Sequence, residues 1–172
     1  MRTKLASLIL VLFLNLFFSC KKDPDSYPIE PSIAFKEFIP INKYEAVLTL
    51  TFTDGDGDIG LKTTDTIGIY GKSTPYYYNL YIKTFYKSNN GIFKDTLIYD
   101  VLTNKLDSGL IKQRIQFVEK TTKEDYLKGQ FIINLNGYRQ SLSHKIIKYK
   151  IYFYDRALHK SNEIETPELI VP

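Results

Sequence analysis

The chain has few of the residues on which metal, redox and nucleophilic chemistry usually depend. Its 172 residues include one cysteine, two histidines and no tryptophan. A single cysteine excludes an intrachain disulfide, and neither His144 nor His159 has a second histidine or a thiol at metal-ligand spacing. The Gly-x-Ser-x-Gly and His-Glu-x-x-His motifs are also missing. These absences favour a protein that is not an enzyme.

Long hydrophobic runs are scarce, and the run at the N-terminus is short. Arg2 and Lys4 precede an apolar stretch from Leu5 to Phe18, which is 14 residues long, whereas a helix that crosses a bilayer needs about 20. A positive start, a short apolar stretch and a small residue before a cut are typical of an export signal. The alternatives are a short buried helix and a membrane span. We expect residues 1–19 to be a signal peptide.

The residues at the expected cut carry a resemblance. Phe17-Phe18-Ser19-Cys20 resembles the lipobox of bacterial lipoproteins, although two phenylalanines replace the aliphatic and small residues that the motif prefers. The resemblance implies cleavage before Cys20, lipidation of its thiol and acylation of the new amino terminus. Two or three acyl chains would anchor the protein stably, because one chain binds a membrane only marginally. The expected location is the outer membrane, on either its periplasmic or its surface-exposed face.

An excess of one charge sign is also missing once the signal is removed. Residues 1–19 hold two of the 23 basic residues and none of the 19 acidic ones, so 21 basic residues remain against 19 acidic ones. This balance gives no reason to expect a nucleic-acid partner. Residues 20–31 combine the lipidated cysteine with Pro24, Pro28 and Pro31 among polar residues, which predicts a flexible tether. Residues 32–172 then form one domain.

Short alternating patterns of apolar and polar residues predict that this domain is built from strands. Residues 46–53, 131–135 and 147–154 alternate with a period of two. Residues 76–87 and 92–101 are rich in aromatic and branched side chains, and Asn89-Asn90-Gly91 between them favours a hairpin turn. Further strands are expected near residues 33–38, 66–70, 110–118 and 163–171. Thr121, Glu124 and Gly129 predict one brief helix.

Many short strands with little helix predict an all-β fold, namely a two-sheet antiparallel immunoglobulin-like sandwich. Tyr76, Tyr77, Tyr78 and Tyr81 form a candidate binding face, since exposed rings stack on sugars or pack against partner proteins. The simpler interpretation places alternate rings in the core and leaves the others scattered on the surface.

An acidic loop is the strongest candidate site. The strand pattern ends in Asp54-Gly55-Asp56-Gly57-Asp58, where glycine lets the backbone curl so that the carboxylates aim inwards. Crowded carboxylates repel one another unless a cation neutralises them, and hard oxygen donors suit Ca²⁺. The alternative is a solvated turn, because Asp and Gly are common turn residues.

The loop resembles the Asp-x-Asp-x-Asp loops of EF-hand, dockerin and thrombospondin type 3 repeats, with Asp65 at the twelfth position. Ile59 replaces the glycine of an EF-hand loop and no helices flank it, so an EF-hand fold is excluded. A second segment, Asp155-Arg156-Ala157 up to Ser161-Asn162, resembles a turn near the C-terminus of bacterial immunoglobulin-like and fibronectin type III-like domains. If residues 45–53 are strand B and residues 146–155 are strand F of an immunoglobulin sandwich, the loops that follow them lie at the same end. We then expect Asp155 near the acidic loop, as a further ligand or as the partner of Arg156.

Taken together, the lipobox, the tether, the acidic loop and the closing turn look like a group of uncharacterised lipoproteins of the Bacteroidota envelope. This likeness implies a location and a fold and no reaction. Two functions remain open. The first is a non-enzymatic binding or structural module, with an envelope protein or a glycan as partner and Ca²⁺ stiffening the loop. The second is a carbohydrate-active hydrolase or a glycan-binding component of an uptake system, in which paired carboxylates would act in a cleft.

Overall fold

The computed structural model describes residues 27–100, 105–120, 124–138 and 143–172. Within these ranges the chain is nearly all β, and the only helical turns are two short 3-10 segments, Gly68–Tyr70 and Pro75–Tyr77. None of the described residues belongs to a helix long and apolar enough to cross a membrane. The strands are β1 (Ser32–Pro40), β2 (Glu45–Asp54), β3 (Leu80–Lys87), β4 (Phe93–Asp95), β5 (Leu97–Asp100), β6 (Lys105–Ser108), β7 (Leu110–Gln113), β8 (Leu127–Asn136), β9 (Ile146–Phe153), β10 (Ile164–Glu165) and β11 (Leu169–Ile170).

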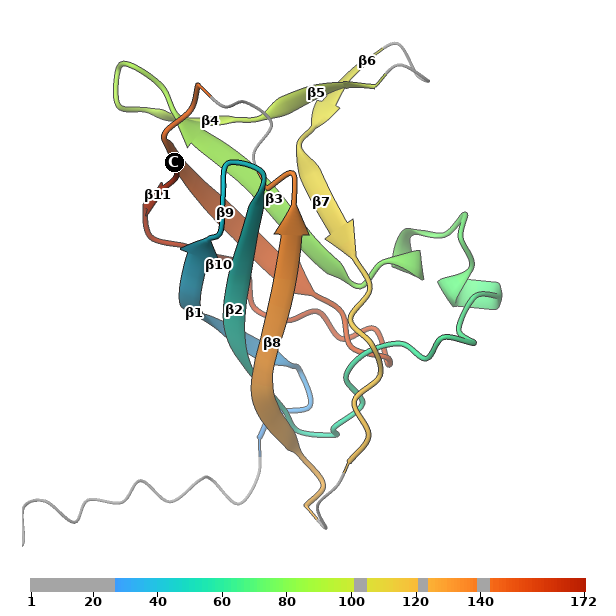
Figure 1. The fold of residues 1–172 in the computed structure, drawn as a ribbon. Helices are drawn as coiled ribbons and strands as arrows, with labels where there is room; N and C mark the ends of the chain where they lie inside the picture. Colours follow the sequence, from blue (N-terminus) through green and yellow to red (C-terminus); the bar gives the residue numbers. More distant parts are fainter. Residues whose placement is uncertain (1–26, 101–104, 121–123, 139–142) are drawn as a thin grey trace, which may run out of the picture.

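Two antiparallel sheets face each other and form a β-sandwich, as predicted. One sheet has the order β1-β2-β8, and the other has the order β10-β9-β3-β4, with β11 also paired to β9 and β7 also paired to β3. The first sheet lies in front of the second in Figure 1. Equating β1, β2 and β8 with strands A, B and E, and β3, β9 and β10–β11 with C, F and G, gives the neighbour order of an immunoglobulin-type sandwich.

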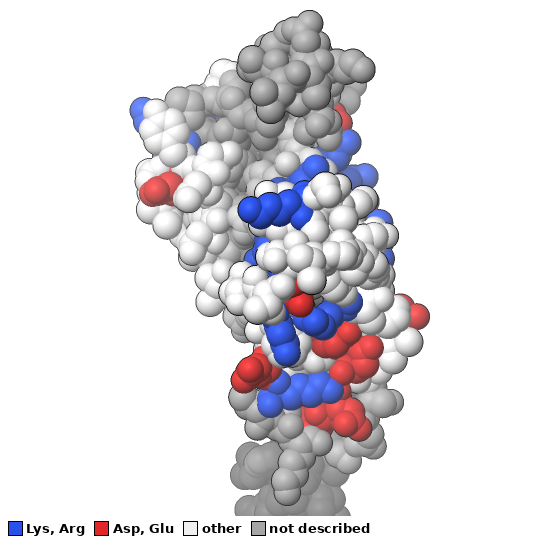
Figure 2. Space-filling view, turned by 90° about the vertical axis from the view of Figure 1, so that its right-hand side faces the viewer, with Lys and Arg blue, Asp and Glu red and all other residues white. Residues whose placement is uncertain are grey.

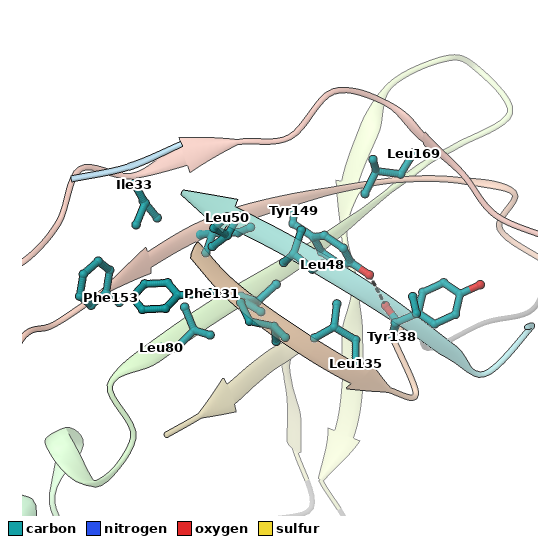
Figure 3. Packing of buried hydrophobic residues seen from close by; sticks show 14 of the residues in the cluster. Ile33, Leu48, Leu50, Leu80, Phe131, Leu135, Tyr138, Tyr149, Phe153 and Leu169 are labelled. Atoms are coloured by element: carbon teal, nitrogen blue, oxygen red, sulfur yellow. Dashed lines mark hydrogen bonds between the residues drawn. The ribbon is translucent and has the colours of Figure 1, made fainter. Parts of the chain in front are cut away.

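The alternating patterns place one face of each sheet in the core. In β9 the burial alternates residue by residue, with Ile147, Tyr149, Ile151 and Phe153 all buried. Apolar side chains of β2 and β8 meet them from the opposite sheet, and Figure 3 shows this layer between the two sheets. The period-two prediction for these three strands is therefore confirmed. The residues from β2 and β8 are Ala46, Leu48, Leu50, Phe52, Phe131, Ile133 and Leu135.

Two buried tyrosines close the core near the end of β8. The Tyr149 hydroxyl donates a hydrogen bond of 2.8 Å to the carbonyl of Tyr138, and the Tyr138 hydroxyl donates one of 3.1 Å to the carbonyl of Asn42. A buried hydroxyl without a partner would cost free energy on the order of 1–3 kcal/mol. Both rings can therefore remain buried because their hydroxyls are satisfied (Figure 3).

Several expected elements differ from the structure. The strand expected at residues 66–70 is wrong, because Gly68 takes a left-handed φ of 59° and the chain turns into the 3-10 segment Gly68–Tyr70. The strand expected from Tyr76 begins only at Leu80, since Pro75 opens the second 3-10 segment. The helix expected near Thr121 is wrong at Gly129, which lies inside β8 with the Phe52 ring packed over it. Residues 121–123 lie outside the described residues.

The remaining strand predictions hold in part. The turn after β3 contains Gly91 with a φ of 82°, as a tight turn requires, but the returning segment divides into β4 and β5 around Thr96. The segment 110–118 is a strand only as far as Gln113. The segment 163–171 splits into β10 and β11 because Pro167, between them, has no N–H to donate. The predicted signal peptide, Cys20 and the tether up to residue 26 lie outside the described residues.

Candidate metal site at one end of the sandwich

The acidic loop leaves β2 at one end of the sandwich and is fixed by backbone contacts on both sides. The Gly55 N–H donates a hydrogen bond of 2.9 Å to the Pro28 carbonyl, and a Cβ at Gly55 would lie 2.5 Å from that oxygen. Further along, the Val118 N–H donates to the Ile59 carbonyl over 3.0 Å, and the Ile59 side chain is fully buried. The loop is therefore held by core packing and by neighbouring backbone, unlike a turn that only joins two strands.

Asp155 reaches the same end from the other sheet. It follows β9, and its carboxylate accepts hydrogen bonds from the His159 backbone N–H over 2.8 Å and from the His159 ring over 2.9 Å. Leu158 between them has a φ of 71°, the only positive φ of a non-glycine residue among those described. The Arg156 N–H donates to the Asp58 carbonyl over 3.2 Å. The turn after β9 is thus joined directly to the acidic loop after β2.

Four carboxylates meet where these two segments touch. Asp54, Asp56, Asp58 and Asp155 each offer one oxygen, and the four oxygens lie within 4.8 Å of one another. Asp54 and Asp155 have relative exposures of 0 %. The structure thus brings together four of the five residues predicted as ligands, three from the loop after β2 and one from the turn after β9.

The carboxylates are incompletely satisfied by protein groups. Asp54 Oδ2 accepts a hydrogen bond of 2.9 Å from the Asp58 N–H. The Oδ1 atoms of Asp54, Asp56 and Asp58 are buried and have no hydrogen-bond partner. Nearly all buried polar atoms in folded proteins have a partner, so these three carboxylate oxygens could accept a metal ion.

The burial and crowding of these carboxylates raise the pKa values of three of them. Burial, followed by the charge of Asp56, raises the pKa of Asp54 from its ordinary value of 3.8 to about 7. Burial, followed by the charge of Asp58, raises the pKa of Asp155 to about 6. Burial and the charge of Asp56 also raise the pKa of Asp58. The ionised forms of these three carboxyls are therefore less favourable here than those of exposed aspartates.

The spacing of the oxygens fits one calcium coordination sphere. Oxygens on opposite sides of Ca²⁺ are separated by twice the metal–ligand distance, about 4.6–5.2 Å, while around Mg²⁺ the same separation is about 4.0–4.2 Å. The four oxygens, which lie within 4.8 Å of one another, can therefore surround Ca²⁺ without contraction of the site. Backbone carbonyls and waters would have to complete the six to eight ligands that Ca²⁺ takes.

Asp65, the fifth residue predicted as a ligand, lies outside the cluster. Its carboxylate pairs with the Arg156 guanidinium, with 3.1 Å between Asp65 Oδ1 and Arg156 Nη2, and it accepts the Lys62 N–H over 2.8 Å. Burial alone would raise the pKa of Asp65, but the hydrogen bonds from Arg156 and Lys62 outweigh it and lower that pKa. Asp65 thus supports the loop from outside, and Asp155 is not the partner of Arg156.

Sequence reasoning missed His159 as a member of this site. Its Nδ1 lies 2.9 Å from Asp155 Oδ2 and 3.9 Å from Asp56 Oδ2, and the hydrogen bond to Asp155 raises the pKa of His159. A signal was present in its spacing, since His159 follows Asp155 by four residues across a tight turn. When the ring is protonated, it offsets part of the negative charge from the edge of the cluster.

The four tyrosines predicted as a binding face do not form one exposed surface. Tyr81 is only 8 % exposed, and its hydroxyl donates to the Tyr78 carbonyl over 2.9 Å. The Tyr76 ring packs edge-on against Tyr154, and the Arg114 guanidinium lies over Tyr77. Tyr78 alone is exposed, at 39 %. Most of this set therefore stabilises the chain that leads into β3.

The surface charge is mixed on the side of the molecule shown in Figure 2. Acidic side chains gather toward the lower end of that view, and basic side chains lie among and above them.

Comparisons of the chain with protein-family models, with curated proteins and with solved structures found no match.

Proposed function

We propose that this chain is a lipid-anchored, non-enzymatic module of the bacterial cell envelope, in which one Ca²⁺ ion holds the loops at one end of a β-sandwich. The observation that carries the proposal is the group of four carboxylates with unpaired, buried oxygens of Asp54, Asp56 and Asp58. The outer-membrane location rests on the lipobox-like residues around Cys20. A protein or a glycan of the envelope is the proposed partner.

A cation at this position would act as a structural link. Asp54 ends β2 in one sheet, and Asp155 follows β9 in the other, so one ion would bridge both layers of the sandwich. The same loop contacts Pro28, which lies within the segment predicted as the N-terminal tether. Occupation of the site would therefore fix the loops and the start of the domain in one arrangement, which lowers the entropy cost of binding a partner.

A hydrolase that uses these carboxylates is less well supported. A glycosidase needs two carboxyl groups that reach the substrate from opposite sides of a bond. Asp54 and Asp155 are fully buried, so a polymeric substrate has no access to them. Burial suits a metal ligand, because the ion replaces water around each carboxylate.

Terbium luminescence tests the proposed site directly. Tb³⁺ has oxygen preferences like those of Ca²⁺ and emits when a nearby aromatic ring is excited. The chain has no tryptophan, so tyrosine must act as the donor. Tyr70 is well placed, because its hydroxyl donates to the carbonyl of Arg156, which adjoins Asp155. We expect the emission to saturate as Tb³⁺ is added and to fall when Ca²⁺ displaces the bound Tb³⁺.

Two variants give the matched comparison. Asp155→Asn removes a charged ligand and should weaken Tb³⁺ binding at least about tenfold, since affinity follows the number of charged ligands. Asp65→Asn removes a carboxylate from the same loop but outside the cluster, and it should leave the affinity within about twofold. Emission that does not saturate, or that both variants weaken equally, would refute the site.

A further inference from the structure

A polar, basic pocket lies at the end of the sandwich opposite the carboxylate cluster. Its volume is about 630 Å³, and it lies where β3 ends and β9 begins. The cluster lies at the other end of the same two strands, which have eight residues each, or about 25 Å at strand rise. In Figure 1 the pocket end is uppermost, and the start of the described chain lies at the lower end. The pocket therefore faces away from the proposed anchor.

The wall of the pocket contains a rigid ring pair. The rings of Tyr86 and His144 stack with their centroids 3.8 Å apart and an interplanar angle of 6°. Tyr86 also packs against the hydrophobic core, so the core fixes the position of the pair. A fixed aromatic wall can contact the apolar face of a sugar ring at little entropy cost.

The charge of the lining has one sign. Lys87, Lys94 and Lys145 line the pocket, and none of the lining residues that the structure describes is acidic. Glu168 neutralises Lys87 over 2.9 Å from outside the pocket, whereas Lys94 and Lys145 are exposed. Two exposed ammonium groups on one pocket attract a ligand that carries carboxylate or sulfate groups.

The remaining lining residues and the size of the pocket narrow the ligand class. Four of them are serine or asparagine, residue types that donate and accept hydrogen bonds as sugar hydroxyls do. The Ser88 hydroxyl also bonds within the turn, to Asn90 Oδ1 over 2.6 Å. A volume of about 630 Å³ is that of a site for a small organic ligand, about 300–1,000 Å³, and far exceeds an inorganic anion. These four are Ser88, Asn89, Asn90 and Ser143.

We infer that this pocket binds an acidic saccharide, with Lys94 and Lys145 holding its negative groups and the Tyr86–His144 pair lying against a sugar ring. The inference deepens the proposed binding function, because it names the ligand class and the surface that a membrane-anchored module presents. It does not depend on occupation of the carboxylate cluster, which lies at the other end of β3 and β9.

The test is a calorimetric titration of the purified protein in EDTA and again in Ca²⁺. The probes are a hyaluronan oligosaccharide, which is acidic, a chitin oligosaccharide of equal length, which is neutral, and inorganic sulfate. We expect the hyaluronan oligosaccharide to bind at least about tenfold more tightly than the other two, a difference of about 1.4 kcal/mol. Binding in EDTA together with an empty metal site would refute only the Ca²⁺ proposal.

The double variant Lys94→Gln, Lys145→Gln should weaken hyaluronan binding at least about tenfold. Lys112→Gln, which removes one exposed charge from β7 outside the pocket, should leave it unchanged. Thermal melting of each variant checks that it is folded. The inference would be overturned if the neutral and acidic sugars bound equally, or if sulfate bound as tightly as hyaluronan. It would also be overturned if Lys112→Gln weakened hyaluronan binding as much as the double variant, or if hyaluronan did not bind at all.

Discussion

Replacing Asp54 with asparagine should stabilise the protein without calcium and remove most of the stabilisation that calcium gives. Asp54 is fully buried and accepts the Asp58 N–H through Oδ2, while its Oδ1 has no partner. An asparagine side chain can keep the first bond through its carbonyl oxygen and can donate its amide to a neighbouring carboxylate. In EDTA, Asp54→Asn should therefore stabilise the protein, because one buried like charge is removed.

The pKa of Asp54 gives the scale of this effect. Since the folded-state pKa is raised, the stability associated with this carboxyl is fully present below pH 3.8 and is lost as the pH rises through about 7. The rise from 3.8 to about 7 corresponds to about 4 kcal/mol as a ceiling. With relaxation of the loop, we expect Asp54→Asn to gain about 2 kcal/mol at pH 8, or about 4–8 °C in Tm.

Calcium should remove most of the advantage of the variant, because it stabilises the wild-type protein more. A site with a Kd of about 10⁻⁴–10⁻³ M gains about 1.4–2.7 kcal/mol from 10 mM Ca²⁺, and Asp54→Asn should lose most of this gain. Thermal melting at pH 8 and pH 4, each in EDTA and in calcium, measures both the effect of the Asp54 charge and the stabilisation by calcium. At pH 4 in EDTA the variant and the wild-type protein should nearly coincide. A variant that is less stable than wild type in EDTA at pH 8 would refute the electrostatic reasoning.

Three further predictions concern the fold, and thermal or urea unfolding measures each of them. Leu50→Ala should cost about 3 kcal/mol because Leu50 is fully buried between the sheets; a loss below about 1 kcal/mol would contradict that packing. Tyr149→Phe should cost about 1 kcal/mol through the hydrogen bond to the Tyr138 carbonyl, and no change would mean that this bond adds nothing. Gly60→Ala should cost at least about 2 kcal/mol, since Gly60 has a φ of 88° and a Cβ there would lie 2.1 Å from the Gln116 carbonyl oxygen. A neutral Gly60→Ala would show that the loop relaxes freely.

Local patterns were sufficient to predict the central strands of the sandwich. Strands β2, β8 and β9 place alternate apolar side chains on one buried face, strictly so in β9, and their sequences contain this period of two. Elements with weaker signals were predicted less well. Gly129 was interpreted as a helix end, but in β8 it makes room for the Phe52 ring, which is a contact between strands. The sequence around Gly129 does not show that Phe52 of another strand packs over it.

The candidate site was predictable to the extent that it follows from strand order. Assigning β2 and β9 to strands B and F was enough to bring Asp155 to the acidic loop. The side-chain pairings within the site were not predictable, because they depend on turn geometry. Asp65 points to Arg156 instead of to the cluster, and His159 reaches Asp155 only because Leu158 takes a left-handed conformation.

A crystal structure of the protein grown in about 10 mM CaCl₂, at least ten times the Kd expected for an extracellular calcium module, tests the central claim most directly. The account predicts one ion between the two sheets, bound by an oxygen of each of Asp54, Asp56, Asp58 and Asp155 at about 2.3–2.6 Å. A water molecule or protonated carboxyl groups in that position, with the four side chains otherwise unchanged, would contradict it.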